Sequence, residues 1–403
     1  MAPTGPIRIA GDLTHDDSPH NDSSRASARD VTERNSNHMK KKRSIVAVVS
    51  AVAALTLVLA GCSGTATPNA TAADGSALPT VSMMVGGIDK QIYLPYQLAE
   101  SLGFYKKYGV NMQLSTEQNG GVGAEEAMVS GQVNFSGAWY IHAPDFQSKG
   151  KNIINLVQLA GAPGERIMCT PAANVKTPAD IRGKKMGVTD LGSGTDQLTQ
   201  FVASKGGVSK TDYTTVAVHA GATAIAALQR GEADCVMTTQ PTVAALESQG
   251  IAVSALDLAT TQGAQQNLGG AWPAAGLLAD ADWVNKNQDT VQKVVLALVA
   301  TMNWMHTHTA KDVADALPQD FVQNSTVSKD QYIAALQADY GQFLPDGLMP
   351  AGGPTTIFQM ESAIGTDVSN VSFSSTFTQQ YAQAALKQLG ITPTTKAADT
   401  TTG

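Results

Sequence analysis

The chain has 403 residues and a net charge of −7, from 27 Lys and Arg against 34 Asp and Glu. An acidic chain disfavours nucleic acid as a partner, because phosphate binding requires clustered basic residues. The length exceeds what one hydrophobic core usually supports, so we expect two domains or lobes.

The first part of the chain divides by composition. Residues 1–38 are polar and lack a periodic apolar pattern, so we expect either a disordered extension or a start codon placed too early, with Met39 the true initiator. Basic residues at 40–43 then precede the apolar run 45–60, which is short for a membrane span. This layout predicts an export signal over 39–61, and the alternative is an uncleaved membrane anchor.

The signal ends in the sequence Leu-Ala-Gly-Cys at residues 59–62, which resembles the bacterial lipobox. The resemblance implies that Cys62 becomes the first residue of the mature protein and carries lipid. The protein would then be extracytoplasmic and attached to the cell membrane through that lipid. Residues 62–78 are rich in Ser, Thr, Ala and Gly, which predicts a flexible tether between the membrane and a folded body.

From Thr80 onward, short apolar runs alternate with helical patterns, which is typical of an α/β fold. In the first block we expect strands at 81–85, 110–114, 133–136 and 153–159, and helices at 94–105, from about 123 to 129, and 143–149. A second block, 166–258, repeats the alternation, with strands at 185–189, 215–218, 233–237 and 251–256, and helices at 196–204, 222–229 and 241–250. A further helix should start at Thr177, which is placed to cap it. A helical tail follows at 289–306, 329–340, 354–364 and 378–389, and we expect residues 393–403 to be disordered.

Cys169 and Cys235 each lie in a short apolar, strand-like run. They either pair as a disulfide, as exported proteins allow, or remain buried thiols. Neither their spacing nor their neighbours indicate a metal site.

In open parallel sheets, ligands bind beyond the carboxyl ends of the strands. Five loops occupy such positions here: 86–91, 117–123, 137–142, 190–196 and 238–241. From these loops and from one later loop we expect the following ligand-binding residues: Asp89, Gln91, Trp139, His142, Gly192, Ser193, Gly194, Thr195, Gln240 and Trp272.

The segment 192–195 (Gly-Ser-Gly-Thr) joins a predicted strand to a predicted helix. Backbone amides at the helix start and the two hydroxyls would favour an anionic or polar group there, and the alternative is a plain capped turn. Trp139 and Trp272 are candidates for stacking on a ligand, although either could instead fill the core. No Gly-x-Ser-x-Gly or His-Glu-x-x-His motif is present, so we expect no catalytic residues, no metal and no cofactor.

Four stretches resemble the solute-binding proteins of bacterial ATP-driven (ABC) importers, in the nitrate/sulfonate/taurine and thiamine-pyrimidine-precursor superfamily. These are 98–105 with 108–110, 127–135, 177–188, and 226–234 with 240–241. The resemblance implies a two-lobed clamshell like the type II periplasmic binding proteins, in which each lobe is an open mixed sheet flanked by helices. Lobe 1 would comprise 79–162 and 262–392, and lobe 2 would comprise 163–261.

The same resemblance implies a monomeric protein that is not an enzyme and that delivers a small solute to the transmembrane subunits of an ABC permease. A nitrate-, sulfonate- or taurine-like solute is expected. The candidate loops hold several carboxylates and no arginine, however, which leaves a neutral or heteroaromatic solute, such as a thiamine pyrimidine precursor, as the alternative. A binding protein that serves a sensor is a further reading. An enzyme like the fungal thiamine-pyrimidine synthases is a remote alternative, because their cysteine-rich iron motif has no counterpart here.

Overall fold

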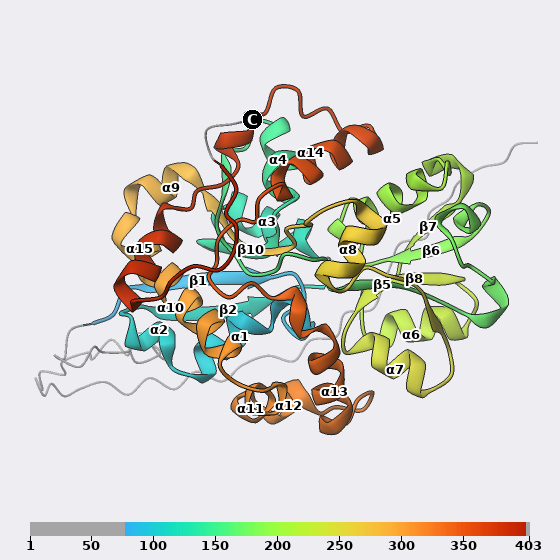
Figure 1. Ribbon diagram of the computed structural model, residues 1–403, viewed down its shortest axis with the longest axis horizontal. Coiled ribbons are helices and arrows are strands. Elements are labelled where there is room, and N and C mark those ends of the chain that lie inside the picture. Colours follow the sequence, from blue (N-terminus) through green and yellow to red (C-terminus); the bar gives the residue numbers. More distant parts are fainter. Residues whose placement is uncertain (1–76, 119, 400–403) are drawn as a thin grey trace, which may run out of the picture. The chain divides into compact units, whose positions relative to one another are not determined.

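The computed structural model describes residues 77–118 and 120–399, which belong to one compact unit, Ala66–Gly403. Two five-stranded mixed sheets flanked by helices form its framework (Figure 1), which confirms the expected α/β fold. The predicted signal at 39–61 and the lipidation residue Cys62 lie outside the described residues. Within the described part, no helix is both long and apolar enough to cross a membrane.

The first sheet has the strand order β2-β1-β3-β10-β4. Strand β1 runs parallel to β2 and β3, whereas β10 runs antiparallel to both β3 and β4. Every residue of β3 is buried, as expected for a central strand that helices cover on both faces. The strands are β1 (Thr80–Val85), β2 (Asn111–Thr116), β3 (Phe135–Trp139), β4 (Ile153–Gln158) and β10 (Ala275–Asp280).

The second sheet has the order β7-β6-β8-β5-β9. Strand β6 is parallel to β7 and β8, and β5 is antiparallel to β8 and β9, so each sheet carries its antiparallel strand second from one edge. The strands are β5 (Glu165–Cys169), β6 (Lys185–Val188), β7 (Thr214–Ala217), β8 (Cys235–Thr239) and β9 (Val253–Asp257).

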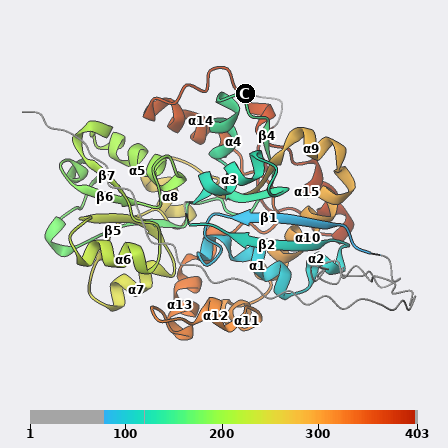
Figure 2. The same cartoon turned by 180° about the vertical axis from the view of Figure 1, so that it is seen from behind.

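Helices cover both faces of each sheet, as the opposite views of Figures 1 and 2 show. On the first sheet, α3 and α4 lie on one face and α1, α2 and α10 on the other; on the second sheet, α5 lies opposite α6 and α7. The helices are α1 (Leu94–Ser101), α2 (Phe104–Lys107), α3 (Gly121–Val129), α4 (His142–Ser148), α5 (Gly194–Lys205), α6 (Ala222–Gln229), α7 (Thr242–Ser248), α8 (Thr261–Leu268), α9 (Ala281–Lys286), α10 (Gln288–His306), α11 (Ala310–Ala316), α12 (Gln319–Val322), α13 (Lys329–Asp339), α14 (Gly353–Ile364) and α15 (Gln380–Leu389).

The chain crosses from the first sheet to the second over residues 159–164 and returns over 258–274. The two crossings bond to each other. The Trp272 amide donates to the Gly161 carbonyl at 3.0 Å, and the Ala274 amide donates to the Ala160 carbonyl at 3.1 Å. The two connections between the sheets therefore run together as a paired segment.

Strand β5 shows how the alternating side chains of one strand serve two separate cores. Ile167 and Cys169 face the large core that extends through the first sheet, whereas Met168 packs into a second cluster with α6 and α7. This period of two is the expected geometry of a strand with helices on both faces. Cys169 lies directly opposite Cys235 on β8, with Cα atoms 4.0 Å apart, and the two form a disulfide. The pairing that the sequence left open is therefore present.

Several elements differ from the sequence-based expectations. The helix expected over 94–105 is divided into α1 and α2, because Gly103 adopts a left-handed conformation with φ of +68°. Thr177 does cap a helix, but a short 3₁₀ helix over Pro178–Ile181. Strand β10 and the helices α8, α9, α11 and α12 were not predicted at all.

The expectation of a disordered tail from residue 393 is wrong for residues 393–399. The Thr394 and Thr395 amides donate to the Asp346 carboxylate at 2.8 and 2.7 Å. Ala397 forms a bridge with Pro350, and Ala398 is buried. Small and polar residues give this segment no apolar periodicity, and the buried acceptor Asp346 fixes it instead.

Candidate functional site

A small cavity lies where the carboxyl ends of strands from both sheets meet. Its volume is about 10 Å³, which is close to the space that one water molecule needs. Loops after β1, β2, β3 and β6 supply most of its wall, as expected for ligand sites in open α/β sheets. The lining residues are Lys90, Ile92, Tyr93, Gly120, Gly121, Trp139, His142, Glu165, Thr189, Ser193, Gly194 and Thr195.

Five of the ten predicted ligand-binding residues line this cavity: Trp139, His142, Ser193, Gly194 and Thr195. The structure thus brings together the loop after β3 and the loop after β6, although 53 residues separate His142 from Thr195 in the sequence. The other five do not line it. Asp89 is exposed and Gly192 lies at the outer end of its turn with open space around its Cα.

Gln91 and Gln240 contact each other and α13. The Gln91 amide donates to the Gln240 carbonyl at 2.9 Å, and the Gln91 side chain donates to the Tyr332 carbonyl at 3.0 Å. The Gln240 side chain accepts from the Ala244 amide at the start of α7. Both side chains thus join a loop of one sheet to neighbouring helices and loops.

Trp272 is fully buried, and its ring lies 5.7 Å from the ring of Phe201 on α5. Of the two tryptophans considered for stacking, this one fills the core, and Trp139 is the one at the cavity.

Gly194, the first residue of α5, packs directly on the indole of Trp139. A Cβ added at Gly194 would lie 2.7 Å from Cε3 and 3.0 Å from Cδ2 of that ring, closer than real atoms approach. The absence of a side chain at 194 therefore permits the start of α5, on the second sheet, to touch the end of β3, on the first.

The Ser193 and Thr195 hydroxyls act within their own turn. Ser193 Oγ accepts from the Asp190 and Asp196 amides at 3.3 and 3.4 Å, which makes Ser193 the N-cap of α5. Thr195 Oγ1 accepts from the Thr189 amide at 2.9 Å, and the two hydroxyl oxygens are 2.9 Å apart. Since one hydroxyl must donate to the other, at most one hydroxyl proton is left for a guest.

The backbone of this turn offers more hydrogen-bond donors to a ligand than its two hydroxyls do. Within the described part of the chain, the Gly194 and Thr195 amides at the start of α5 donate to no protein atom. Free amides at a helix start, together with its partial positive charge, suit a ligand atom that accepts hydrogen bonds. The capped turn and a polar binding surface are thus both present in the segment 192–195.

Seven lining residues were not predicted as ligand-binding residues: Lys90, Ile92, Tyr93, Gly120, Gly121, Glu165 and Thr189. Gly121 lies against His142, since an added Cβ would be 2.2 Å from its Nε2 atom. Glu165 is the first residue of β5. The sequence marks it only as a charged residue before an apolar run, next to the small-residue segment 161–164, which does not indicate a binding role.

Burial controls the charges at the cavity. Burial lowers the pKa of His142 to about 4, so its imidazole is neutral at pH 7, and its Nδ1 atom has no partner among the described residues. Burial raises the pKa of Glu165 to about 8, against the opposing effect of Lys90. Burial also lowers the pKa of Lys90, whose ammonium donates to the Gly86 carbonyl at 2.9 Å.

Arg166, the arginine next to Glu165, is engaged elsewhere. Its guanidinium donates to both carboxylate oxygens of Asp339 at 2.7 and 2.6 Å and lies 3.3 Å from a carboxylate oxygen of Asp257. This buried bidentate pair links β5 to the end of α13. Arg166 is therefore not free to bind an oxyanion in the cavity.

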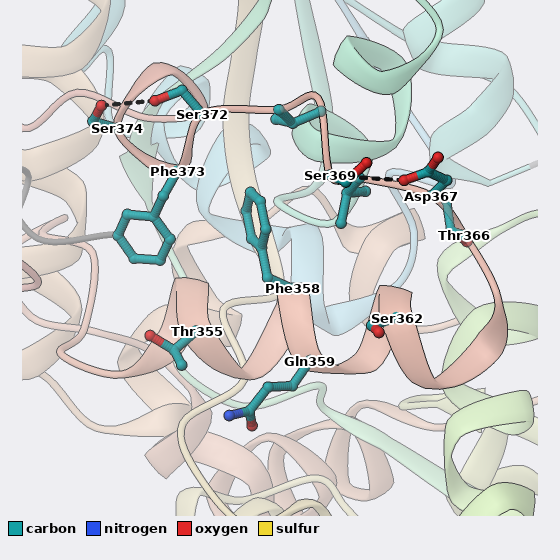
Figure 3. A pocket seen from close by; sticks show the side chains of 12 residues that line it. Thr355, Phe358, Gln359, Ser362, Thr366, Asp367, Ser369, Ser372, Phe373 and Ser374 are labelled. Atoms are coloured by element: carbon teal, nitrogen blue, oxygen red, sulfur yellow. Dashed lines mark hydrogen bonds between the residues drawn. The ribbon is translucent and has the colours of Figure 1, made fainter.

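A larger depression of about 980 Å³ lies outside the sheet ends (Figure 3). It is bounded by α14 and the following segment, with the rings of Phe358 and Phe373 5.6 Å apart. Asp367 accepts from the Ser369 amide within this segment and is the only charged residue among its lining residues. A single helix and its own loop form this surface, so it lacks the convergence of loops that marks the smaller cavity.

Comparisons with known proteins identify the family and the fold of the chain. A family model described as "NMT1/THI5 like" matches residues 92–311, more than half of the chain. "Putative binding protein YtlA" of Bacillus subtilis (strain 168) is 23% identical over 238 residues, which cover 57% of this chain and 67% of YtlA.

Two solved structures extend the comparison. A protein of Bordetella bronchiseptica RB50 is 28% identical, with a TM-score of 0.72, and the match covers 77% of this chain and 98% of that one. The alkanesulfonate-binding protein SsuA from Xanthomonas axonopodis pv. citri, solved with MOPS bound, is 18% identical with a TM-score of 0.55, over 71% of this chain and 92% of SsuA. At that identity SsuA shows the shared fold alone.

Proposed function

Because this chain belongs to the NMT1/THI5-like family, we propose that it is the solute-binding component of an ABC importer. The observation that carries the proposal is the cavity at the strand ends of both sheets, closed by Gly194 against Trp139. Once the lobes separate, a site of this kind can hold a small polar solute between them, and the names of "Putative binding protein YtlA" and of the alkanesulfonate-binding protein SsuA support the class. The protein would pass its solute to the transmembrane subunits of a permease.

The proposed mechanism is opening and closing of lobe 1 (79–162 and 262–392) against lobe 2 (163–261) about the paired crossings. Contacts between the loops of the two sheets hold the closed form: His219 Nδ1 lies 3.2 Å from the Gln118 carbonyl, in addition to the Gln91–Gln240 bond. A cavity of about 10 Å³ cannot hold a sulfonate or a pyrimidine. The lobes must therefore separate to admit a solute, and a solute that touches both lobes favours closure.

Native mass spectrometry and small-angle X-ray scattering test this proposal together. We expect the freshly purified protein to carry a solute that is visible as added mass. After its removal, adding that solute back should reduce the radius of gyration and slow amide exchange at both crossings, 159–164 and 258–274. Saturation with no compaction and no change in exchange would contradict the two-lobe mechanism.

We propose further that the protein catalyses no reaction. In support, the Ser193 and Thr195 hydroxyls bond to each other and to backbone amides, so neither is activated by a base. The two described cysteines are joined in a disulfide, which leaves no thiol for a cysteine-rich iron motif there. Because a desulfurization enzyme also shares the fold, the fold itself does not decide this point. Recovery of the solute with unchanged mass after prolonged incubation supports a carrier.

Lipid attachment through Cys62 completes the proposal. We expect Cys62→Ala to abolish fatty-acid labelling and to leave an unprocessed precursor or a released protein, since two or more acyl chains are needed for stable membrane attachment. Metabolic labelling with a fatty-acid probe, followed by fractionation, measures both effects. Equal labelling of the variant and the unaltered protein would exclude this anchor.

A further inference from the structure

One carboxyl oxygen of Glu165, Oε2, lies in the cavity wall without a hydrogen-bond partner among the described residues. Its side chain lines the cavity, the residue is only 2% exposed, and Oε2 is bonded to no atom of the described residues. A buried polar atom left unpaired costs on the order of 1–3 kcal/mol, so such an atom in a binding site marks where a ligand atom completes the hydrogen bonding.

The neighbouring cations do not satisfy this carboxyl. No ion pair joins Glu165 to Lys90 among residues 77–118 and 120–399, and the Lys90 ammonium donates instead to the Gly86 carbonyl. Arg166 is held by Asp339 and Asp257. Glu165 Oε2 therefore has no donor among the described residues; the other unpartnered polar atom of the cavity wall there, His142 Nδ1, belongs to a neutral imidazole.

The opposite wall of the cavity offers hydrogen-bond donors instead of an acceptor. There the free amides of Gly194 and Thr195 at the start of α5 offer donors, beside the face of Trp139. A simple oxyanion could bind these amides but would leave the carboxyl unpaired or repelled. A solute with an acceptor at one end and a donor at the other could satisfy both walls.

On the premise of the proposed solute-binding function, we infer that the solute carries an N–H donor, as an amine or amino-substituted ring does, and that Glu165 accepts from it. Glu165 then selects amino-bearing solutes over simple oxyanions such as nitrate or an alkanesulfonate. Charged and titratable groups that act on Glu165 are Lys90, Arg166 and Asp339, with Tyr93 in the same wall. Burial raises the pKa of Glu165, and a bound ammonium would favour its ionised form.

Matched probes test the inference. The affinities of 2-aminoethanesulfonate and ethanesulfonate, and of 4-aminopyrimidine and pyrimidine, are measured by calorimetry at pH 7 on protein freed of its co-purified solute. In at least one pair we expect the amino-bearing member to bind tenfold or more tightly than its partner, which corresponds to about 1.4 kcal/mol. Glu165→Gln should reduce that preference to less than about threefold, because the amide cannot ionise beside a bound ammonium and presents N–H groups of its own.

Glu361→Gln is the matched control. Glu361 on α14 is also a fully buried carboxyl, and burial raises its pKa to about 7, but it does not line the cavity. The Glu361→Gln variant should leave the preference for the amino-bearing probe unchanged. If a variant fails to fold, the preference of the unaltered protein decides the question alone.

Three results would overturn the inference: in both pairs the member without the amino group binds as tightly as its partner, Glu165→Gln leaves the preference intact, or no amino-bearing probe binds. The first result is the one expected if a protonated Glu165 donates to an oxyanion. In each case, a co-purified solute seen by mass spectrometry would keep the solute-binding function in place. Absence of any bound solute and any binding probe would remove both.

Discussion

Replacing Gly194 with valine should weaken solute binding by about tenfold or more and leave the melting temperature of the solute-free protein within a few degrees. The new side chain would overlap the indole of Trp139, so it opposes closure. The helix itself should tolerate it, because Gly194 is not in a left-handed conformation and stands at the first position of α5. Calorimetry with the co-purified solute and a thermal melt separate the two effects.

Gly341→Val provides the control, because a Cβ at Gly341 meets no atom within 4 Å and its φ is not positive. It should change neither binding nor scattering. Shortening the opposing side chain by Trp139→Ala should restore compaction to the Gly194→Val protein, since the overlap is then gone. A Gly194→Val protein that unfolds, or that binds normally, would show that the contact does not control closure.

Replacing Glu125 with glutamine should stabilise the protein at alkaline pH by a few kcal/mol. Glu125 on α3 is 0% exposed, and burial raises its pKa to about 8 against the smaller opposing effect of the Ser136 hydroxyl. The carboxyl is therefore protonated in the folded protein at a pH where the unfolded chain ionises it. Its contribution to stability is present in full below pH 4.5 and is lost as the pH rises through 8, by about 1.4 kcal/mol for each unit of pKa difference.

The contribution of His142 to stability depends on pH in the opposite direction. Its pKa of about 4 in the folded protein lies below the ordinary 6.5, so its contribution is present above pH 6.5 and is lost as the pH falls towards 4. Urea unfolding should therefore be measured between pH 6.5 and 9, where folded His142 stays neutral; the titration of His142 in the unfolded chain is common to both proteins and cancels in their comparison. Glu165 acts in the same direction as Glu125, so the substitution should remove only part of the slope.

Glu126→Gln is the control for Glu125→Gln, because Glu126 is the next residue of α3 and is exposed. It should leave the pH dependence unchanged. Stability curves for Glu125→Gln and the unaltered protein that stay parallel from pH 6.5 to 9 would show that Glu125 is ionised, or paired, in the folded state.

Much of the fold could be predicted because its signals are local. The helix expected at 222–229 has the bounds of α6, and alternating apolar runs marked β1, β2 and β6 to within a few residues. Strand β10 could not be found this way. Its sequence, Ala-Gly-Leu-Leu-Ala-Asp, has weak strand preference, and it is a strand because it fits between β3 and β4, which lie far away in the sequence.

The candidate site likewise contains residues that the sequence pattern could predict and residues that it could not. The rule that ligands bind at strand ends identified Trp139, His142 and Gly194, because each follows a strand that the sequence pattern shows. Glu165 could not be identified from the pattern, because its position beside Lys90 and Tyr93 depends on where the first crossing delivers β5. Gln91 and Gln240 lie in the expected loops, but neighbouring backbone groups bind them.

The placement of β10 between β3 and β4 has a consequence for how the protein is made. All strands of the second sheet lie within 165–257, so that sheet is complete once this contiguous stretch has left the ribosome or the export channel. The first sheet is not, because its gap between β3 and β4 is filled only when residues 275–280 arrive. Until then β3 and β4 expose unpaired edges, which is the condition under which strands of different chains associate. The sheet whose strands are synthesised first is thus the last to be completed. Its strands β3 and β4 wait for β10 while the whole second sheet is being synthesised.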